Sequence, residues 1–435
     1  MTERSLAAYI NARRIGELVD AGGVWSFRYA ASWLQSPGSY FLSPHLAPEG
    51  DLVTDGASQR PVQWYFDNLL PEEGQRSLLA SDARIDEADA FGLLAHYGAE
   101  SVGSLTLLPP GRLPADTGER RPLTFGDLSE RIRGLPRLPL THAAPKRMSL
   151  AGAQHKLAVN FDGEAFFEPV DETPSTHILK PDHPDPAYAH SAANEYFVMR
   201  LAARMRLQVP RVAKLYIPEP VYVIERFDRV KTGAGWERLH VVDACQLLNL
   251  DRAFKYHQGS IERLAELANH CRSAAVARSR LFEWLVFNVL TGNDDAHLKN
   301  LSFLVSGAGV QLAPHYDLLC TAVYDSRAFD QAGWPDRTTL AWPVLGARRH
   351  ADISREKLLD AAEALGLARR TGERILAFQS SRILAVAQEL QDEIEAKDRE
   401  RYANDPRVLT SITAEARTIR AVIHTIISDT IRQLG

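Results

Sequence analysis

Alternating apolar and polar positions dominate the start of the chain and predict short β-strands. Trp25, Phe27 and Tyr29 occupy every second position, as in a strand with one buried face. Apolar stretches on both sides of the turn Asn11–Arg14 predict a hairpin. Residues 1–108 therefore predict a first unit of mixed short strands and helices.

The middle of the chain carries a second group of strand patterns, interrupted by one helical segment. Ala193, Phe197 and Leu201 recur at helical spacing and predict a helix over 187–207. The predicted strands are Leu157–Phe161, Phe166–Pro169, Thr176–Lys180, Val212–Ile217 and Val221–Phe227. From Asp243 onward the pattern becomes helical, apart from one hairpin. The expected fold class is α+β, with a small β-rich lobe followed by a larger helical lobe.

Prolines and glycines cluster between Pro109 and Pro145 and predict a domain boundary there. We expect four segments along the chain. They are an N-terminal subdomain at 1–108, a linker at 109–145, a β-rich lobe at 146–227 and a helical lobe with the catalytic loop at 228–435.

Composition narrows the class of protein. The 435 residues carry a net charge of −5, which gives no bulk attraction to polyanions such as nucleic acid. Cys245, Cys271 and Cys320 lack C-x-x-C spacing, which argues against a zinc site or a disulfide framework and suits a reducing compartment. The longest apolar run, Leu281–Leu290, is too short to span a bilayer and contains Glu283. Because the start of the sequence also lacks an apolar signal core, we expect a cytoplasmic protein.

The strongest chemical signal is T-G-N-D-D-A-H-L-K-N, residues 291–300. Asp295 and Asn300 have the D-x-x-x-x-N spacing of a kinase catalytic loop, in which the aspartate accepts a hydroxyl proton and the asparagine binds Mg²⁺. A predicted hairpin then leads to Asp317, where a kinase places its second metal-binding carboxylate. Phosphoryl transfer needs these groups together on rigid elements. The alternative is that Asp294 and Asp295 only cap a helix or belong to a polar turn.

Two upstream features extend this signal, and each has a simpler interpretation. Lys180 ends an apolar strand and Glu195 lies on the next helix, as a phosphate-contacting lysine and its partner do. A solvated charge at a strand end is the alternative. The segment S-L-A-G-A-Q-H-K, residues 149–156, resembles a phosphate loop only weakly because Gly152 is its single glycine. From the residues alone, an ordinary small-residue turn is the better interpretation.

The motifs S-L-A-G-A-Q-H-K, H-I-L-K, N-E-Y, I-E-R-F-D-R, N-D-D-A-H-L-K-N and H-Y-D follow one another along the chain. In this order they resemble the HipA kinases, the toxins of bacterial HipBA toxin–antitoxin modules. The motifs F-R-Y-A and Y-F-D-N-L-L-P-E extend the resemblance to the first unit. It implies a two-lobed protein-kinase-like fold with an additional N-terminal subdomain. It also implies an ATP- and Mg²⁺-dependent serine/threonine protein kinase.

At matching positions the resemblance implies a role for each motif residue. Asp295 would be the catalytic base, Asn300 and Asp317 would bind Mg²⁺, and Ser149 would be autophosphorylated. The residues implied in ATP binding are Ala151, Gly152, Ala153, Gln154, His155, Lys156, Lys180, Glu225, Arg226, Phe227, His297, Leu298, Lys299, Asn300, Tyr316 and Asp317. His155 stands where an acidic residue is often seen, so the charge and regulation of this loop could differ.

Ser149 also has a physical rationale as a regulatory site. A dianionic phosphate there would repel the phosphates of ATP or draw the loop towards cationic side chains. Autophosphorylation is therefore expected to inhibit the kinase. Without the resemblance, Ser149 would be interpreted as a loop or capping serine.

The resemblance also implies partners. These are a small helix-turn-helix antitoxin that binds operator DNA and a protein substrate such as an aminoacyl-tRNA synthetase, whose phosphorylation arrests growth. Arg348, Arg349 and His350 form a basic cluster in a predicted loop. We interpret this cluster as solvated surface charge and keep contact with operator phosphates as the alternative.

Two other classes of function stay open. One is a catalytically silent co-repressor that binds the antitoxin, although it would not need the intact set of Lys180, Asp295, Asn300 and Asp317. The other is a kinase of small molecules, against which the first unit and the loop at Ser149 argue. The sequence does not indicate which protein is phosphorylated.

Overall fold

The computed structural model describes residues 3–115, 117–142, 144, 148, 150–152, 154–233 and 235–435. The chain forms two compact units, and each is built from three separate stretches of sequence. Unit 1 comprises Met1–Lys180, Ile224–Lys255 and Ser302–Ala313. Unit 2 comprises Pro181–Val223, Tyr256–Leu301 and Pro314–Gly435.

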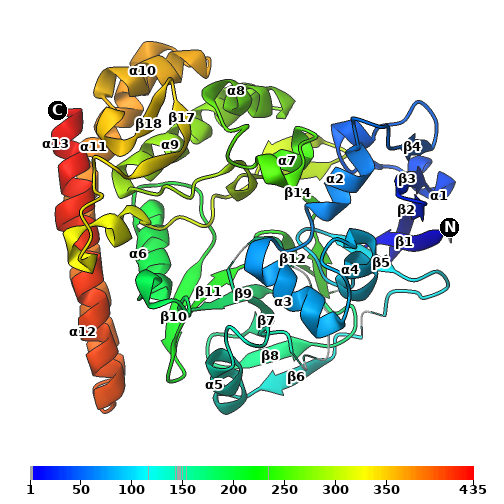
Figure 1. Cartoon of the computed structure of the whole chain (residues 1–435), viewed down its shortest axis with the longest axis horizontal. Helices are drawn as coiled ribbons and strands as arrows, with labels where there is room; N and C mark the ends of the chain where they lie inside the picture. The colour runs from blue at the N-terminus through cyan, green and yellow to red at the C-terminus, as the bar shows by residue number, and fades with distance from the viewer. Residues whose placement is uncertain are drawn as a thin grey trace. The chain divides into compact units, whose positions relative to one another are not determined.

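The first sheet of unit 1 is antiparallel and has the strand order β4-β3-β2-β1-β5. Its strands are β1 (Arg4–Ile10), β2 (Arg13–Ala21), β3 (Val24–Tyr29), β4 (Leu52–Thr54) and β5 (Leu105–Leu108). The helices beside it are α1 (Ala31–Leu34), α2 (Pro61–Asp67), α3 (Glu73–Ala83) and α4 (Ala90–Tyr97). α2 and α4 pack against the sheet (Figure 1). The Phe27 ring lies 4.9 Å from Tyr29 and 5.5 Å from Phe66, so the predicted alternation of aromatics does form a strand with a buried face.

Unit 1 contains further strands outside its first sheet. They are β6 (Arg120–Leu123), β7 (Leu157–Phe161), β8 (Phe166–Pro169), β9 (His177–Pro181), β12 (Arg229–Thr232), β13 (Gly235–Arg238), β14 (Val241–Asp243), β15 (Ser302–Ser306) and β16 (Gly309–Leu312), with helices α5 (Phe125–Arg133) and α7 (Ala244–Leu247). β9, β7, β8 and β6 are successive neighbours in one sheet, and β14, β15 and β16 form another. The stretch 109–145 thus contains β6, which pairs with β8, and α5. The predicted division of the chain into four segments stays a prediction.

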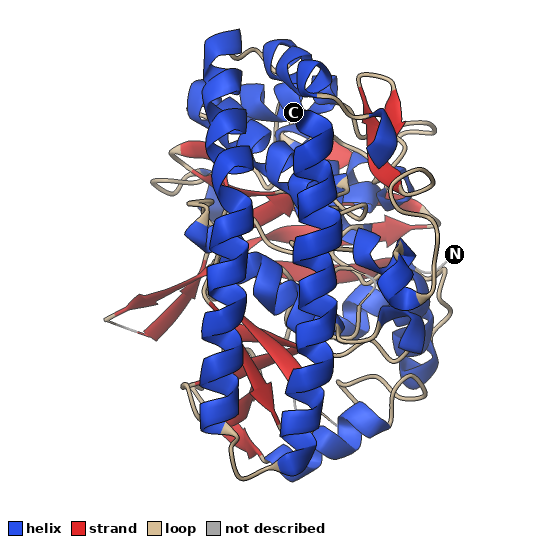
Figure 2. Ribbon diagram, turned by 90° about the vertical axis from the view of Figure 1, so that its left-hand side faces the viewer, coloured by secondary structure: helices blue, strands red, loops and turns tan. Residues whose placement is uncertain are grey.

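Unit 2 is mainly helical. Its helices are α6 (Ser191–Arg204), α8 (Ile261–His270), α9 (Ala274–Thr291), α10 (Arg355–Ala364), α11 (Arg369–Arg401), α12 (Pro406–Ala421) and α13 (Ser428–Leu434), and its strands are β10 (Val212–Tyr216), β17 (Thr339–Val344) and β18 (Ala347–Arg349). The strand β11 (Pro220–Glu225) begins in this unit, and its last two residues are counted with unit 1. A π-helical turn, Val422–Ile427, joins α12 to α13. α11 runs beside α12 (Figure 2), and Gln391 Nε2 donates to Ala416 O at 3.2 Å between them.

The predicted helical lobe contains more strands than the one hairpin expected there. Besides the predicted hairpin β15–β16, residues 228–435 contain the pairs β12–β13 and β17–β18 and the strand β14. These strands have three to six residues each, so their period-2 signal is too brief to stand out between helices.

The apolar run Leu281–Leu290 lies in α9, where Phe282, Trp284 and Phe287 are almost fully buried. No helix within the described residues is both long and apolar enough to cross a membrane. Cys245, Cys271 and Cys320 are buried free thiols.

Candidate active site

The segment that carries the predicted catalytic residues begins where α9 ends. Gly292 closes the helix with a left-handed φ of 63°. A Cβ at this position would lie 2.6 Å from Ile426 Cγ2 and 2.8 Å from Ala322 Cβ. Only glycine therefore combines this backbone conformation with this packing.

Asn293 then ties the loop to its surroundings, although sequence reasoning assigned it no role. Its Nδ2 donates to Asn288 Oδ1 at 2.8 Å and to Asp317 O at 3.3 Å, and its Oδ1 accepts from Asp295 N at 3.1 Å. Asn293 is buried. The only sequence feature that could have indicated this role is that Asn293 stands directly before Asp294 and Asp295.

Asp295 and Asn300 meet as their spacing predicted. Asn300 Nδ2 donates to Asp295 O at 2.8 Å, and His297 N donates to the same oxygen at 2.8 Å. The Asp295 side chain is 45% exposed, whereas His297, Lys299 and Asn300 are buried. A half-exposed carboxylate on a backbone fixed by hydrogen bonds is accessible to a substrate hydroxyl.

Tyr256 contacts the catalytic loop, which the sequence did not predict. The Tyr256 hydroxyl donates to Asp295 Oδ1. The Tyr256 ring also lies edge-on to His297, with centroids 5.0 Å apart and an interplanar angle of 86°. Tyr256 stands 39 positions before Asp295, and no local pattern links the two.

Asp317 is held beside the loop in an unusual backbone conformation. Its φ is 52°, a left-handed value that costs energy for a residue with a side chain and is common at functional sites. The preceding Tyr316 donates its hydroxyl to Lys299 O at 2.9 Å. With the bond from Asn293, two contacts join the Asp317 segment to the catalytic loop.

Asp294, the neighbour of the predicted base, is not an exposed surface charge. Its N–H donates to Thr321 Oγ1 at 2.7 Å, and burial raises the pKa of its carboxyl to about 6. Thr321 Oγ1 in turn donates to Gly292 O at 3.2 Å. The backbone of Asp294 thus anchors the loop to Thr321.

The predicted phosphate loop belongs to unit 1. Gly152 has a φ of 108°, and Lys156 Nζ donates to Ala151 O at 2.6 Å across the loop. His155 Nδ1 lies 2.8 Å from Gln75 Nε2, within hydrogen-bonding distance. Gln154 is half-buried. Ser149 and Ala153 lie outside the described residues.

The other nucleotide candidates of unit 1 lie on or after strands. Lys180 is buried in β9, and Glu225 and Phe227 are half-buried. Arg226 differs, because its N–H donates to Thr176 O at 2.9 Å and its guanidinium contacts Glu100 at 2.8 Å. Only the carbonyl of Arg226 would remain for the predicted contact with ATP.

The basic cluster is smaller than predicted and is not a loop. Arg348 and Arg349 are exposed on β18, and Arg349 pairs with Asp352 at 2.8 Å. His350 is buried against Trp334, and burial lowers its pKa to about 4. His350 therefore adds no positive charge to this surface at neutral pH.

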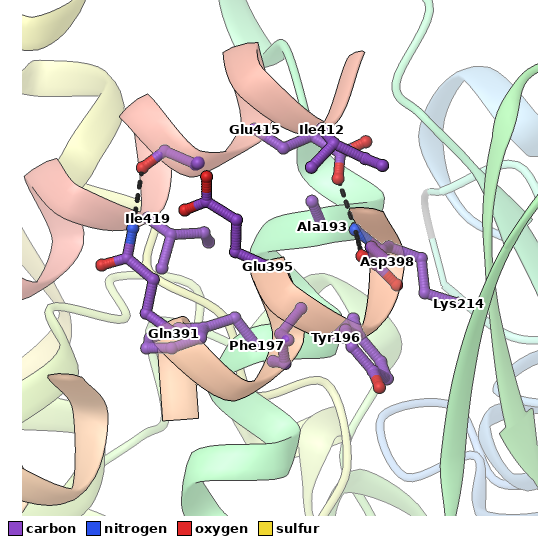
Figure 3. A pocket seen from close by; sticks show the side chains of 12 residues that line it. Ala193, Tyr196, Phe197, Lys214, Gln391, Glu395, Asp398, Ile412, Glu415 and Ile419 are labelled. Atoms are coloured by element: carbon purple, nitrogen blue, oxygen red, sulfur yellow. Dashed lines mark hydrogen bonds and ion pairs between the residues drawn. The ribbon is translucent and has the colours of Figure 1, made fainter. Parts of the chain in front are cut away.

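A pocket of about 350 Å³ in unit 2 contains none of the predicted site residues (Figure 3). It lies between α6, β10, α11 and α12. Lys214 there forms ion pairs with Asp398, at 3.0 Å, and with Glu415. Because these charges neutralise one another within the pocket wall, we interpret the cluster as packing between helices.

Comparison with known families identifies the chain. The family model described as HipA N-terminal domain matches residues 6–108, and the model described as HipA-like C-terminal domain matches residues 148–397. The chain belongs to the HipA family. The family predicted from the motifs is therefore confirmed.

Similar proteins agree with this assignment. The kinase homologue Y4mE of Sinorhizobium fredii is 34% identical over 341 residues, covering 74% of this chain and 79% of that protein. The serine/threonine-protein kinase toxin HipA of Shewanella oneidensis is 30% identical over 342 residues, covering 74% of this chain and 76% of that toxin. The predicted enzyme class, a serine/threonine kinase of the HipA toxin type, is thereby confirmed.

The fold agrees as well. The Shewanella oneidensis MR-1 HipA structure, solved with HipB and its operator DNA, superposes with a TM-score of 0.75 at 25% identity. The match covers 98% of this chain and 99% of that chain. The predicted α+β, kinase-like HipA fold is confirmed.

Proposed function

We propose that this HipA-family kinase transfers the γ-phosphoryl group of ATP to protein serine or threonine hydroxyls, with Asp295 as the catalytic base. The observation that carries the proposal is the junction between the catalytic loop and the Asp317 segment in unit 2. Asn293 and Tyr316 make that junction with hydrogen bonds at 3.3 and 2.9 Å. The half-exposed Asp295 carboxylate would accept the hydroxyl proton of the substrate.

Asn300 and Asp317 would hold Mg²⁺. The Asn300 amide nitrogen faces Asp295 O, so the amide oxygen points to the other side of the group, and oxygen is the ligand that Mg²⁺ prefers. One amide and one carboxylate would leave the remaining coordination positions to phosphate oxygens and water. Bound Mg·ATP supplies the phosphoryl group and neutralises its charge.

The nucleotide contacts follow from the same proposal. Lys180 would contact the phosphates, and the backbone of residues 151–156 would cradle them, which the positive φ of Gly152 supports. Glu225, Arg226 and Phe227 would offer backbone groups to the adenine. His297, Leu298, Lys299 and Tyr316 would line the nucleotide from the catalytic side.

Regulation and partners complete the proposal. Ser149 would be autophosphorylated and thereby switch the kinase off. A HipB-like helix-turn-helix antitoxin would be the partner, since the similar Shewanella structure contains HipB and operator DNA. The exposed Arg348 and Arg349 are the candidate contacts to DNA in such an assembly. The substrate would be a translation factor such as an aminoacyl-tRNA synthetase.

The test is transfer of label from γ-labelled ATP in the presence of Mg²⁺, followed by peptide mapping. We expect wild-type protein to label Ser149 and Asp295→Asn to remain unlabelled although folded. Ser149→Ala should lose the self-label yet still label an added protein substrate. An unlabelled wild type that is also not stabilised by ATP would contradict the proposal and favour the silent co-repressor.

A further inference from the structure

The backbone and the side chain of Asp295 are held by different parts of unit 2. Asn293, His297 and Asn300, all within the catalytic loop, bond its N–H and its carbonyl oxygen. The carboxylate has one hydrogen-bond donor among the described residues, the Tyr256 hydroxyl, which binds Oδ1. His297 Nε2 lies 4.0 Å from Oδ1, beyond hydrogen-bonding distance.

The segment around Tyr256 is itself fixed against the catalytic loop. A Cβ on Gly259 would lie 2.5 Å from the Trp342 indole, so the backbone there passes directly against this ring. Trp342 Nε1 donates to Ala296 O at 3.0 Å. The Tyr256 ring also contacts the edge of His297. Tyr256 therefore approaches Asp295 from a segment that shares Trp342 with the loop.

We propose that Tyr256 is a positioning residue that orients the catalytic carboxylate for proton transfer. This inference rests on the proposed role of Asp295 as the base. A carboxylate that is 45% exposed can rotate between orientations, and each rotation away from the substrate hydroxyl lowers the productive fraction. The hydrogen bond to Oδ1 selects one orientation and leaves Oδ2 for the substrate.

The same geometry would also allow Tyr256 to block the base, and the two roles predict opposite changes in the rate of transfer. Tyr256 offers Asp295 a hydroxyl, as a serine substrate would. If the tyrosine occluded the base, its removal would raise the rate of transfer. If it positions the base, its removal lowers kcat while the KM for ATP stays constant, because the ATP contacts proposed above do not include Tyr256.

The experiment compares Tyr256→Phe with wild type in steady-state transfer of label to a protein substrate. Tyr256→Phe keeps the ring against His297 and removes only the hydroxyl. We expect kcat to fall about tenfold, the effect of one hydrogen bond to a carboxylate, with the KM for ATP within about twofold. Tyr188→Phe, at a tyrosine that is 45% exposed, is the matched control and should leave both constants unchanged.

Thermal unfolding and ADP binding equal to those of wild type would show that the variant is folded. If the variant is unstable, single-turnover transfer at low temperature with wild type alongside still compares the chemical step. Unchanged kcat, raised kcat, or a raised KM alone would overturn the inference. If wild type shows no transfer that depends on Asp295, the proposed function fails first and the inference fails with it.

Discussion

At the scale of single residues, the catalytic loop depends on positions that have no chemistry of their own. Gly292 is the clearest case, because two constraints meet there. Its φ of 63° is costly for any residue with a Cβ, and the space for that Cβ is already occupied by Ile426 and Ala322. Asn293 follows directly and organises three backbone or side-chain partners by hydrogen bonds.

Gly292→Ala is therefore expected to destabilise unit 2 by about 2–4 kcal/mol, the combined cost of left-handed backbone and overpacking. Gly346→Ala is the matched control, because Gly346 has a φ of 83° but no atom within 4 Å of an added Cβ. It should cost only the backbone part, about 1–2 kcal/mol. Urea unfolding of both variants measures the difference. Equal losses of unfolding free energy in the two variants would show that Ile426 and Ala322 move aside for the added Cβ at no cost in stability.

At the scale of elements, distant segments are joined by charges as well as by apolar packing. Glu100 in unit 1 is fully buried and accepts from Arg226 at 2.8 Å, Arg229 at 2.7 Å and Arg238 at 3.0 Å. Asp228 is the second carboxylate of this cluster. Three guanidinium groups thus face two carboxylates, and burial lowers the pKa of Arg229 to about 10.

Glu100→Gln should be strongly destabilising, by about 3–5 kcal/mol, because it leaves buried guanidinium groups without enough negative charge. Glu17→Gln is the control, since the Glu17 side chain is 37% exposed and pairs with Arg14 at 3.4 Å. Its loss should stay below about 1 kcal/mol. Denaturant unfolding followed by tryptophan fluorescence compares the two variants. A small loss for Glu100→Gln would mean that water or Asp228 compensates.

Elements with a clear period were predictable from the sequence, and the others were not. β7 and β8 have the predicted bounds because short, largely apolar stretches lie on both sides of the turn Asp162-Gly163. β6, R-R-P-L, has too few apolar residues for such a pattern and lies among prolines. It becomes a strand because β8 offers it hydrogen-bond partners.

The residues of the candidate site likewise fall into those that local sequence patterns predicted and those that they did not. Asp295, Asn300 and Asp317 were predicted from one motif and one hairpin, and hydrogen bonds join their segments in the structure, while their roles stay a prediction. Tyr256 and Glu100 could not be found, since their partners lie 39 and 126 positions away. Arg226 was predicted to bind ATP from its motif, and the contacts of the Arg226 and Arg229 side chains with the buried Glu100 were not predicted. Contacts over long sequence separations leave no local pattern.

At the scale of the whole molecule, buried histidines link stability to pH. Burial lowers the pKa of His177, His240 and His350 to about 4, that of His315 to about 3, and that of His190 below its usual range. Burial also raises the pKa of Asp182 and Asp294 to about 6, and those of Asp55 and Glu283 above their usual range. Both units contain members of the histidine set.

The two groups act in opposite directions as pH falls. Between pH 6.5 and 4 the unfolded histidines bind protons that the folded ones do not, so stability is lost on acidification. Between pH 6 and 4 the folded carboxyls bind protons that the unfolded ones do not, so they add stability on acidification. The four histidines with a pKa of about 3 to 4 outnumber the two carboxyls with a pKa of about 6, so the histidines decide the sign.

The free energy of unfolding should therefore fall from pH 6.5 to pH 4.5, and His240→Asn should flatten that slope. His240 is fully buried between Tyr65 Oη, at 3.2 Å, and Leu42 O, at 3.0 Å, and it contributes up to about 3 kcal/mol across the range. The variant will be less stable at every pH, so the slope and not the absolute value is the measurement. His424→Asn, at an exposed histidine, should leave the slope unchanged. Parallel curves for wild type and His240→Asn would mean that His240 is solvated enough to protonate in the folded protein.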